Sequence, residues 1–188
     1  MNRDLSTLKP DDLKILTPGE PEATGDNQRR LGAVLAIFLE TEQGTSLLFT
    51  KRAADLEEHA AQISFPGGAV EPGDRDYQAA ALRETWEEIG IEAAELRIIT
   101  ALPCQPVLNT WLIHPFAAWW PSPRPLDPSP AEVERVIIAP LAELQHQHQK
   151  ECWLEPDPEL SCRYLISGEL LWGATARITG RILEGLLC

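Results

Sequence analysis

The chain has 188 residues, of which 44% are hydrophobic and 24% are charged. This composition is ordinary for a globular protein of one domain. The formal net charge of −13 repels nucleic acid and anionic lipid at long range and attracts metal cations. No apolar stretch approaches the ~20 residues of a membrane-spanning helix, and no secretion signal is visible. We therefore expect a cytoplasmic protein that binds neither nucleic acid nor membrane.

The first half of the chain begins with a polar segment and continues into strand and helix patterns. Residues 1–28 are predicted to form a loop-like N-terminal extension with one helical turn at Asp11–Leu16. Leu31–Glu40 and Ser46–Arg52 are apolar runs that flank "TEQGT", a pattern typical of a β-hairpin. Asp76–Ile89 has helical periodicity, and Gly90 is a stop signal.

The second half predicts further strands, a loop and a closing helix. "LRIITAL" and "WLIHPFAAWW" favour strands, and "VERVIIAPL" favours a strand that runs into a short helix. "PSPRPLDPSP" has five prolines in ten residues and predicts a loop, because proline lacks the N–H that a sheet needs. Leu171–Leu186 has helical spacing. The irregular order of strands and helices predicts an α/β fold with a mixed sheet, as a single domain over residues 29–188.

The cysteines and histidines give a weak metal signal. Cys104, Cys152, Cys162 and Cys188 include no Cys-x-x-Cys pair, which argues against structural zinc and predicts reduced thiols. His146 and His148 could bind a metal through alternate positions, although "LQHQHQK" is more simply a polar loop after a short helix.

Three glutamates share one face of the predicted helix 76–89. At about 100° per residue, Glu84, Glu87 and Glu88 point in similar directions. The opposite side is predicted to meet the core through Ala79, Leu82, Trp86 and Ile89. A solvated face is the simple alternative, but like charges four residues apart repel, and no lysine lies between Asp74 and Ile91. The pattern therefore favours a hard divalent cation such as magnesium.

The segment before this helix, "FPGGAVEPGD", suits the same site. Gly67 and Gly68 allow the backbone to approach the helix closely and to offer a carbonyl oxygen to a metal. Arg83, beside Glu84, is predicted to pair with an acid of the helix or with Asp74 and so to orient the carboxylates.

These residues resemble the Nudix box, a glycine, five residues, an acid, a spacer and then Arg-Glu-U-x-Glu-Glu-x-Gly-U, where U is apolar. The matching positions are Gly68, Asp74, Arg83, Glu84, Glu87, Glu88, Gly90 and Ile91. Asp74 replaces the usual Glu, the spacer has eight residues in place of seven, and Thr85 fills the first U.

A second signature lies directly upstream. "LFTKRAADLEEHAAQISFPGG", from Leu48 to Gly68, is similar to the motif of the coenzyme A pyrophosphatase branch, which carries the same longer spacer. Ala53 replaces the Ser of that motif, and Ala61 replaces a Gly. The matches are Thr50, Arg52, Leu56, His59, Gln62, Phe65, Pro66, Gly67 and Gly68.

The resemblance implies a Nudix-type α/β/α sandwich that hydrolyses a diphosphate with Mg²⁺ or Mn²⁺. Coenzyme A would give 3′,5′-ADP and 4′-phosphopantetheine, and an acyl-CoA would give the acylated form of the second product. Glu84, Glu88 and the carbonyl of Gly68 are the expected metal ligands. Glu87 is a further ligand or the catalytic base, and the roles of Glu84 and Glu87 could be exchanged. Arg83 supports catalysis by orienting these acids.

Four residues of the upstream signature are candidates for substrate binding. Arg52, and with it Lys51, would meet substrate phosphates, and Arg52 is the candidate for the 3′-phosphate; a surface ion pair is the alternative. His59 would contact substrate or brace the loop, and Gln62 would contact substrate. Outside this signature, Glu132 or Glu134 could supply a base from beyond the helix.

Two other functions remain open at this point. One is a Nudix pyrophosphatase for ADP-ribose, NADH or an oxidised nucleotide, which the Leu48–Gly68 signature disfavours. The other is a non-catalytic nucleotide sensor, a class that usually loses box carboxylates that are all present here. The residues do not decide the oligomeric state, and a homodimer is one option.

Overall fold

The computed structural model describes residues 4–16, 18, 29–55, 60–107, 110–155, 157 and 161–187. The helices are α1 (Tyr77–Ile89), α2 (Leu141–Gln147) and α3 (Gly173–Leu187), with 3-10 turns η1 (Asp12–Ile15), η2 (Ala93–Glu95) and η3 (Cys152–Leu154). The strands are β1 (Arg30–Thr41), β2 (Gly44–Arg52), β3 (Ile63–Ser64), β4 (Gly67–Ala69), β5 (Arg97–Ala101), β6 (Gln105–Val107), β7 (Trp111–Trp120), β8 (Val133–Pro140), β9 (Tyr164–Ile166) and β10 (Glu169–Leu171). None of the described helices is long and apolar enough to cross a membrane.

A mixed sheet forms the centre of the fold. β1 and β7 run parallel, with Arg30 opposite Trp111 and Leu39 opposite Trp120. The predicted hairpin is present, because β2 returns antiparallel to β1. The other pairings in the sheet are also antiparallel: β4 lies on β1, β3 and β8 lie on β2, and β5 and β6 lie on β7. This arrangement confirms the predicted α/β fold with a mixed sheet.

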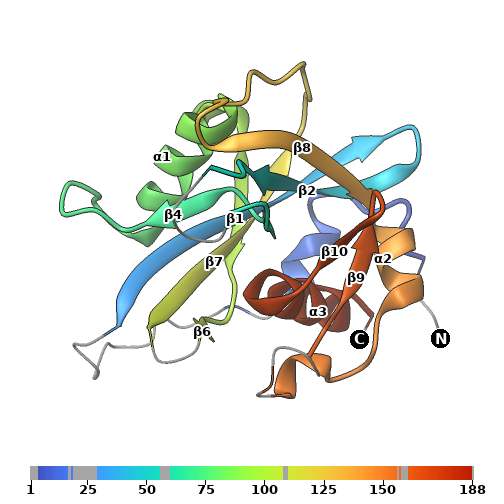
Figure 1. Cartoon of the computed structure of the whole chain (residues 1–188). Coiled ribbons are helices and arrows are strands. Elements are labelled where there is room, and N and C mark those ends of the chain that lie inside the picture. The colour runs from blue at the N-terminus through green and yellow to red at the C-terminus, as the bar shows by residue number, and fades with distance from the viewer. Residues whose placement is uncertain are drawn as a thin grey trace.

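Helices cover both faces of the sheet, with α1 on one side and α3 on the other (Figure 1). The alternation along β1 explains the two cores. Leu35 and Ile37 belong to the apolar cluster beneath α1, whereas Ala36 and Phe38 belong to the cluster that α3 completes. Strand side chains point alternately to opposite faces, so one buried strand serves both layers.

The N-terminal segment is more deeply packed than its predicted loop character suggests. Four leucines there are at most 4% exposed and join the core on the α3 side: Leu5, Leu8, Leu13 and Leu16. The helical turn predicted at Asp11–Leu16 is present as η1. Gly185 of α3 packs closely enough on Leu16 that an added Cβ would lie 3.2 Å from its Cδ2 atom.

The closing helix starts two residues later than predicted. Leu171 lies in β10, opposite Tyr164 of β9, and α3 begins at Gly173. The reason is a tight turn at Ser167 and Gly168, whose φ angles of 51° and 80° reverse the chain into a hairpin. Such a turn depends on local backbone geometry that helical spacing alone does not reveal.

The prediction of reduced thiols is wrong for two of the cysteines. A disulfide joins Cys152 to Cys162, and it packs on α3 where Gly180 leaves room: an added Cβ would lie 2.7 Å from the Cys162 sulfur. The two cysteines are ten positions apart in the chain, which is not the spacing of a Cys-x-x-Cys motif. Cys188 lies outside the described residues.

The two histidines of "LQHQHQK" do not come together as a pair. α2 extends through Gln147, so this stretch is partly helical and not the predicted loop. His146 is exposed. The side chain of His148 is 3% exposed; its Nδ1 atom lies 3.1 Å from the Tyr164 hydroxyl and its Nε2 atom 3.0 Å from a Glu184 carboxylate oxygen.

Candidate active site

Helix α1 begins and ends at clear local signals. Asp76 caps its N-terminus, because the Asp76 carboxylate accepts a 2.7 Å hydrogen bond from the amide of Ala79. Gly90 ends it in the left-handed conformation, with φ of 73°. These signals confirm the predicted helix to within one residue.

The face of α1 that meets the core differs from the prediction. The buried residues are Ala80, Ala81, Thr85, Glu88 and Ile89, whereas Trp86 is 56% exposed. The two alanines allow the helix to lie close to the sheet, and the Thr85 hydroxyl is satisfied by donating to the carbonyl of Ala81 at 2.7 Å. The acidic face is therefore turned partly into the protein and is not simply solvated.

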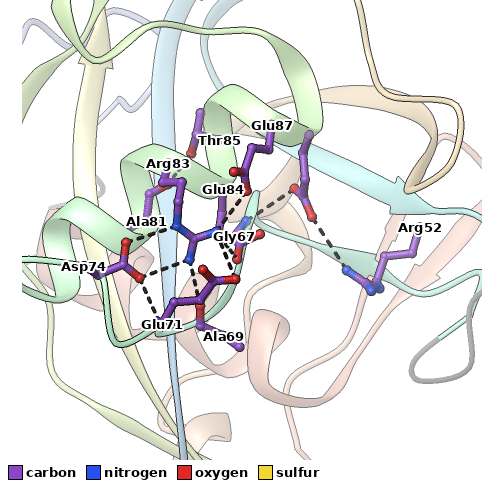
Figure 2. Close-up of polar contacts among 11 residues, drawn as sticks. Arg52, Gly67, Ala69, Glu71, Asp74, Ala81, Arg83, Glu84, Thr85 and Glu87 are labelled. Atoms are coloured by element: carbon purple, nitrogen blue, oxygen red, sulfur yellow. Dashed lines mark hydrogen bonds and ion pairs between the residues drawn. The ribbon is translucent and has the colours of Figure 1, made fainter.

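Arg83 joins the acids Asp74, Glu84 and Glu87 (Figure 2). Its Nε and Nη2 atoms donate to the two carboxylate oxygens of Asp74, each at 3.0 Å. Its Nη1 atom donates at 2.9 Å to both Glu84 and Glu87, and Nη2 also donates to the carbonyl of Ala69 at 3.0 Å. A guanidinium is suited to this because its donors form a rigid fork. Arg83 thus links the loop before α1 to the acidic face, as the sequence predicts.

Glu88 is the most enclosed of the three glutamates, with 1% of its surface exposed. The Gly67 amide donates to its Oε2 atom at 3.3 Å, and the Arg52 Nη1 atom lies 3.6 Å from its Oε1 atom. Burial raises the pKa of Glu88 to about 8, although Arg52 and the Gly67 amide oppose the shift. A carboxylate in this setting requires positive charge close by when it is ionised.

Gly68 makes room for Glu84. A Cβ atom at position 68 would lie 2.6 Å from the carboxyl carbon of Glu84, so only glycine fits there without displacing the acid. Burial raises the pKa of Glu84, while the neighbouring Arg83 lowers it. The role of the Gly68 carbonyl as a metal ligand stays a prediction.

A third carboxylate joins Glu84 and Glu88 from outside the helix. Oxygen atoms of Glu84, Glu88 and Glu132 all lie within 4.8 Å of one another. The proline-rich loop brings Glu132 there: the Ser129 amide donates to the carbonyl of Glu88 at 2.8 Å, and the Glu132 amide donates to Ser129 at 3.0 Å. The sequence identified Glu132 as a possible base but not its proximity to the helix.

Glu87 and Glu134 point elsewhere. Glu87 is not part of the three-carboxylate group; its side chain is 40% exposed and pairs with Arg83. Glu134 pairs with Lys51 at 3.0 Å, and Lys51 also reaches Glu169 at 3.0 Å. The catalytic role expected of Glu87 therefore stays a prediction.

The carboxylate group fits a divalent cation. Three oxygen-bearing acids converge, two of them on largely buried side chains, and hard cations such as magnesium prefer oxygen ligands. A bound divalent cation would supply charge neutralisation at a diphosphate and acidify a water.

A cleft of about 800 Å³ opens beside these acids. Arg52 and Gln62 line it together with Gly68, whereas Lys51 is not among its lining residues, and His59 lies outside the described residues. Most of the wall is apolar and comes from β1, the segment from β3 to β4, β6, β7, and α3 with the residue before it: Val34, Ile63, Phe65, Pro106, Val107, Trp111, Ile113, Trp172 and Ile178.

A comparison with protein families matches residues 29–159 to the NUDIX domain. The chain belongs to the Nudix family. It is 30% identical over 175 residues to a protein of Photorhabdus laumondii named uncharacterized Nudix hydrolase NudL, covering 92% of both chains. A protein of the same name from Escherichia fergusonii is 32% identical over 155 residues, covering 81% of this chain and 80% of the relative.

Solved Nudix structures share the fold. An Ap4A hydrolase of C. elegans in a binary complex has a TM-score of 0.51 and 22% identity, covering 62% of this chain and 84% of its own. The NUDIX domain of Shewanella oneidensis NrtR, complexed with ADP ribose, has a TM-score of 0.51 and 15% identity, covering 68% of this chain and 82% of its own. The present Nudix protein is a hydrolase that acts on a phosphoric anhydride, in a substrate that bears a pyrophosphate.

Proposed function

We propose that this Nudix hydrolase cleaves the diphosphate of coenzyme A or an acyl-CoA, giving 3′,5′-ADP and 4′-phosphopantetheine or its acyl form. One observation carries the proposal. Residues of the coenzyme A signature line the same cleft beside the carboxylate group: Arg52, Gln62, Phe65, Gly67 and Gly68. The apolar wall of this cleft suits the organic part of such a substrate, while Arg52 and Gln62 in its lining suit the phosphates.

The proposed cofactor is Mg²⁺, or Mn²⁺ in its place. Glu84 and Glu88 are the principal ligands, because both carboxylates lie in the group of three and are largely shielded from solvent. Charge from Arg83 and a glycine at position 68 hold Glu84 in position. The preference for these cations follows from an all-oxygen donor set.

We assign phosphate binding, proton transfer and the positioning of Arg83 to three further residues. Arg52, which lines the cleft, binds a phosphate oxygen of the substrate. Glu132 accepts the proton of the attacking water, since it is the carboxylate of the group that comes from outside the helix. Glu87 keeps Arg83 oriented through their 2.9 Å contact and is the alternative base.

A direct assay tests the proposal. The protein is incubated with Mg²⁺ and, separately, with coenzyme A, ADP-ribose, NADH and an oxidised nucleotide, and the products are identified by mass. We expect coenzyme A to be turned over fastest, with 3′,5′-ADP as a product. Faster hydrolysis of another substrate would assign the cleft to that nucleotide, and no hydrolysis of coenzyme A would overturn the proposal. The cytoplasmic location and a homodimer stay predictions from the sequence.

A further inference from the structure

Arg52 reaches both halves of the site. It lies at the end of β2, where the pairing with β8 shifts register between Lys51 and Arg52. Such an irregularity redirects a side chain. Arg52 lines the cleft, yet its Nη1 atom also lies 3.6 Å from the Oε1 atom of Glu88. The same guanidinium therefore contacts a carboxylate of the expected metal group and borders the space for substrate.

The contact between Arg52 and Glu88 places a positive charge next to a buried carboxyl group. Glu88 is 1% exposed and lies near two further acids, Glu84 and Glu132. Arg52 provides positive charge to this buried carboxylate. A divalent cation held by the three acids would provide that charge instead and would repel the guanidinium.

The guanidinium has capacity for another partner. Its Nε atom is buried and makes no hydrogen bond within the part of the chain that the structure describes. The backbone is fixed, because the Arg52 amide donates to the carbonyl of Gln62 at 3.0 Å. Only the side chain needs to turn for Arg52 to meet an anion in the cleft.

We propose that Arg52 exchanges partners, from Glu88 in the metal-free protein to a phosphate oxygen of the substrate when the carboxylates hold a divalent cation. This inference rests on the proposed function and adds an order of binding to it. In the metal-free protein Arg52 competes with the cation for the ionised form of Glu88. In the loaded protein Arg52 is available, so cation and diphosphate bind cooperatively through one side chain.

Equilibrium binding tests the exchange without measuring activity. Calorimetry follows Mn²⁺ into metal-free protein, and then methylenediphosphonate, which is not hydrolysed, into Mn²⁺-loaded protein. Arg52→Gln should bind Mn²⁺ about 5-fold more tightly, because a competing ion pair of modest strength is removed. The same variant should bind methylenediphosphonate at least about 10-fold more weakly, because a charge-assisted hydrogen bond is lost.

Arg135→Gln is the matched control. Arg135 lies on β8 opposite Lys51, and its guanidinium pairs with Glu169, away from the cleft. Like Arg52→Gln, the Arg135→Gln variant replaces one arginine by glutamine and so removes one positive charge. It should leave both affinities close to those of the wild type, apart from a small effect of net charge on Mn²⁺ binding.

Two results would overturn the exchange. In the first, Arg52→Gln binds Mn²⁺ no more tightly than Arg135→Gln does. In the second, Arg52→Gln binds methylenediphosphonate as tightly as the wild type does. Circular dichroism checks that each variant is folded. If Arg52→Gln does not fold, Arg52→Lys replaces it. The Arg52→Lys variant should keep an Mn²⁺ affinity near that of the wild type but bind methylenediphosphonate more weakly. Wild-type protein that hydrolyses coenzyme A while these shifts are absent would retain the proposed function and reject only the exchange.

Discussion

The guanidinium of Arg124 donates a 2.7 Å hydrogen bond to the carbonyl of Gly90, the residue that ends α1. The same side chain forms two 2.8 Å bonds with the Glu95 carboxylate. Arg124 lies in the proline-rich loop that leads to Glu132. The loop is therefore hydrogen-bonded to the C-terminal end of α1, the helix that carries Glu84 and Glu88.

Loss of the Arg124 hydrogen bonds should impair catalysis more than stability. We expect Arg124→Ala to reduce turnover about 10-fold, because Glu132 would be less well positioned. The free energy of unfolding should change little, since solvent screens an ion pair in which the Arg124 side chain is 44% exposed. Activity assays and chemical denaturation measure the two effects, with Arg75→Ala as the control at an exposed ion pair with Asp76. Equal activity of both variants would show that Arg124 does not position the loop.

Gly68→Ala should displace Glu84. The added Cβ would lie 2.6 Å from the carboxyl carbon of Glu84, closer than non-bonded atoms allow. We expect turnover to fall at least about 30-fold, or about 2 kcal/mol of barrier, and Mn²⁺ affinity to fall with it. Gly73→Ala is the control, because an added Cβ there meets no atom within 4 Å. Similar metal affinity in the two variants would contradict the role of Gly68.

Glu88→Gln should lower turnover at least ~100-fold, about 2.7 kcal/mol of barrier, as expected for a lost metal ligand. The fold should survive because the amide keeps the shape of the buried side chain. Steady-state kinetics with coenzyme A, together with a thermal melt, measures both. Glu143→Gln on α2 is an exposed control. A folded Glu88→Gln variant with most of its activity would remove Glu88 from the metal group.

The stability of the metal-free protein should depend on pH through Glu88. Burial raises its pKa in the folded state to about 8, from an ordinary value of 4.5. The folded state then holds a proton that the unfolded state has released. The free energy of unfolding should therefore fall as pH rises from 4.5 to 8, by up to about 1.4 kcal/mol per pH unit. Denaturation in the presence of EDTA should show a flatter dependence in Glu88→Gln, and identical slopes would refute the shift.

The position of Arg52 changes the expectation for substrate choice. From the sequence it is the candidate for the 3′-phosphate of coenzyme A, but its guanidinium lies 3.6 Å from Glu88, where the diphosphate would be bound. We now expect Arg52→Ala to weaken activity on coenzyme A and dephospho-coenzyme A equally, by ~1–3 kcal/mol. Kinetics on both substrates measures this. A loss confined to coenzyme A would restore the assignment to the 3′-phosphate.

Local features of the fold were predictable because they are encoded close together in the chain. Asp76 and Gly90 mark the ends of α1, and the apolar runs at Leu31–Glu40 and Ser46–Arg52 mark the first hairpin. The choice of buried face on α1 was not predictable. Spacing gives the relative directions of side chains, but tertiary packing decided that small alanines, and not Trp86, meet the sheet.

Contacts between distant segments account for what the sequence did not reveal. Glu132 joins Glu84 only because hydrogen bonds tie its loop to α1. The Cys152–Cys162 bridge likewise depends on how the two cysteines pack against Gly180 of α3. Neither relationship leaves a spacing pattern, so motif reading could propose Glu132 as a base but could not place it among the acids.

The parallel pairing of β1 with β7 has a consequence for folding. Arg30 and Trp111 are direct neighbours in the sheet, although about 80 residues separate them in the chain, and closing so long a loop is slow compared with forming a hairpin. The segment Leu48–Ile91 carries most of the chemistry, yet β1 cannot be flanked on both sides until β7 has been synthesised. A nascent chain that stops before residue 111 would hold the whole Nudix box without β7, the strand that pairs with β1 from Arg30 to Leu39.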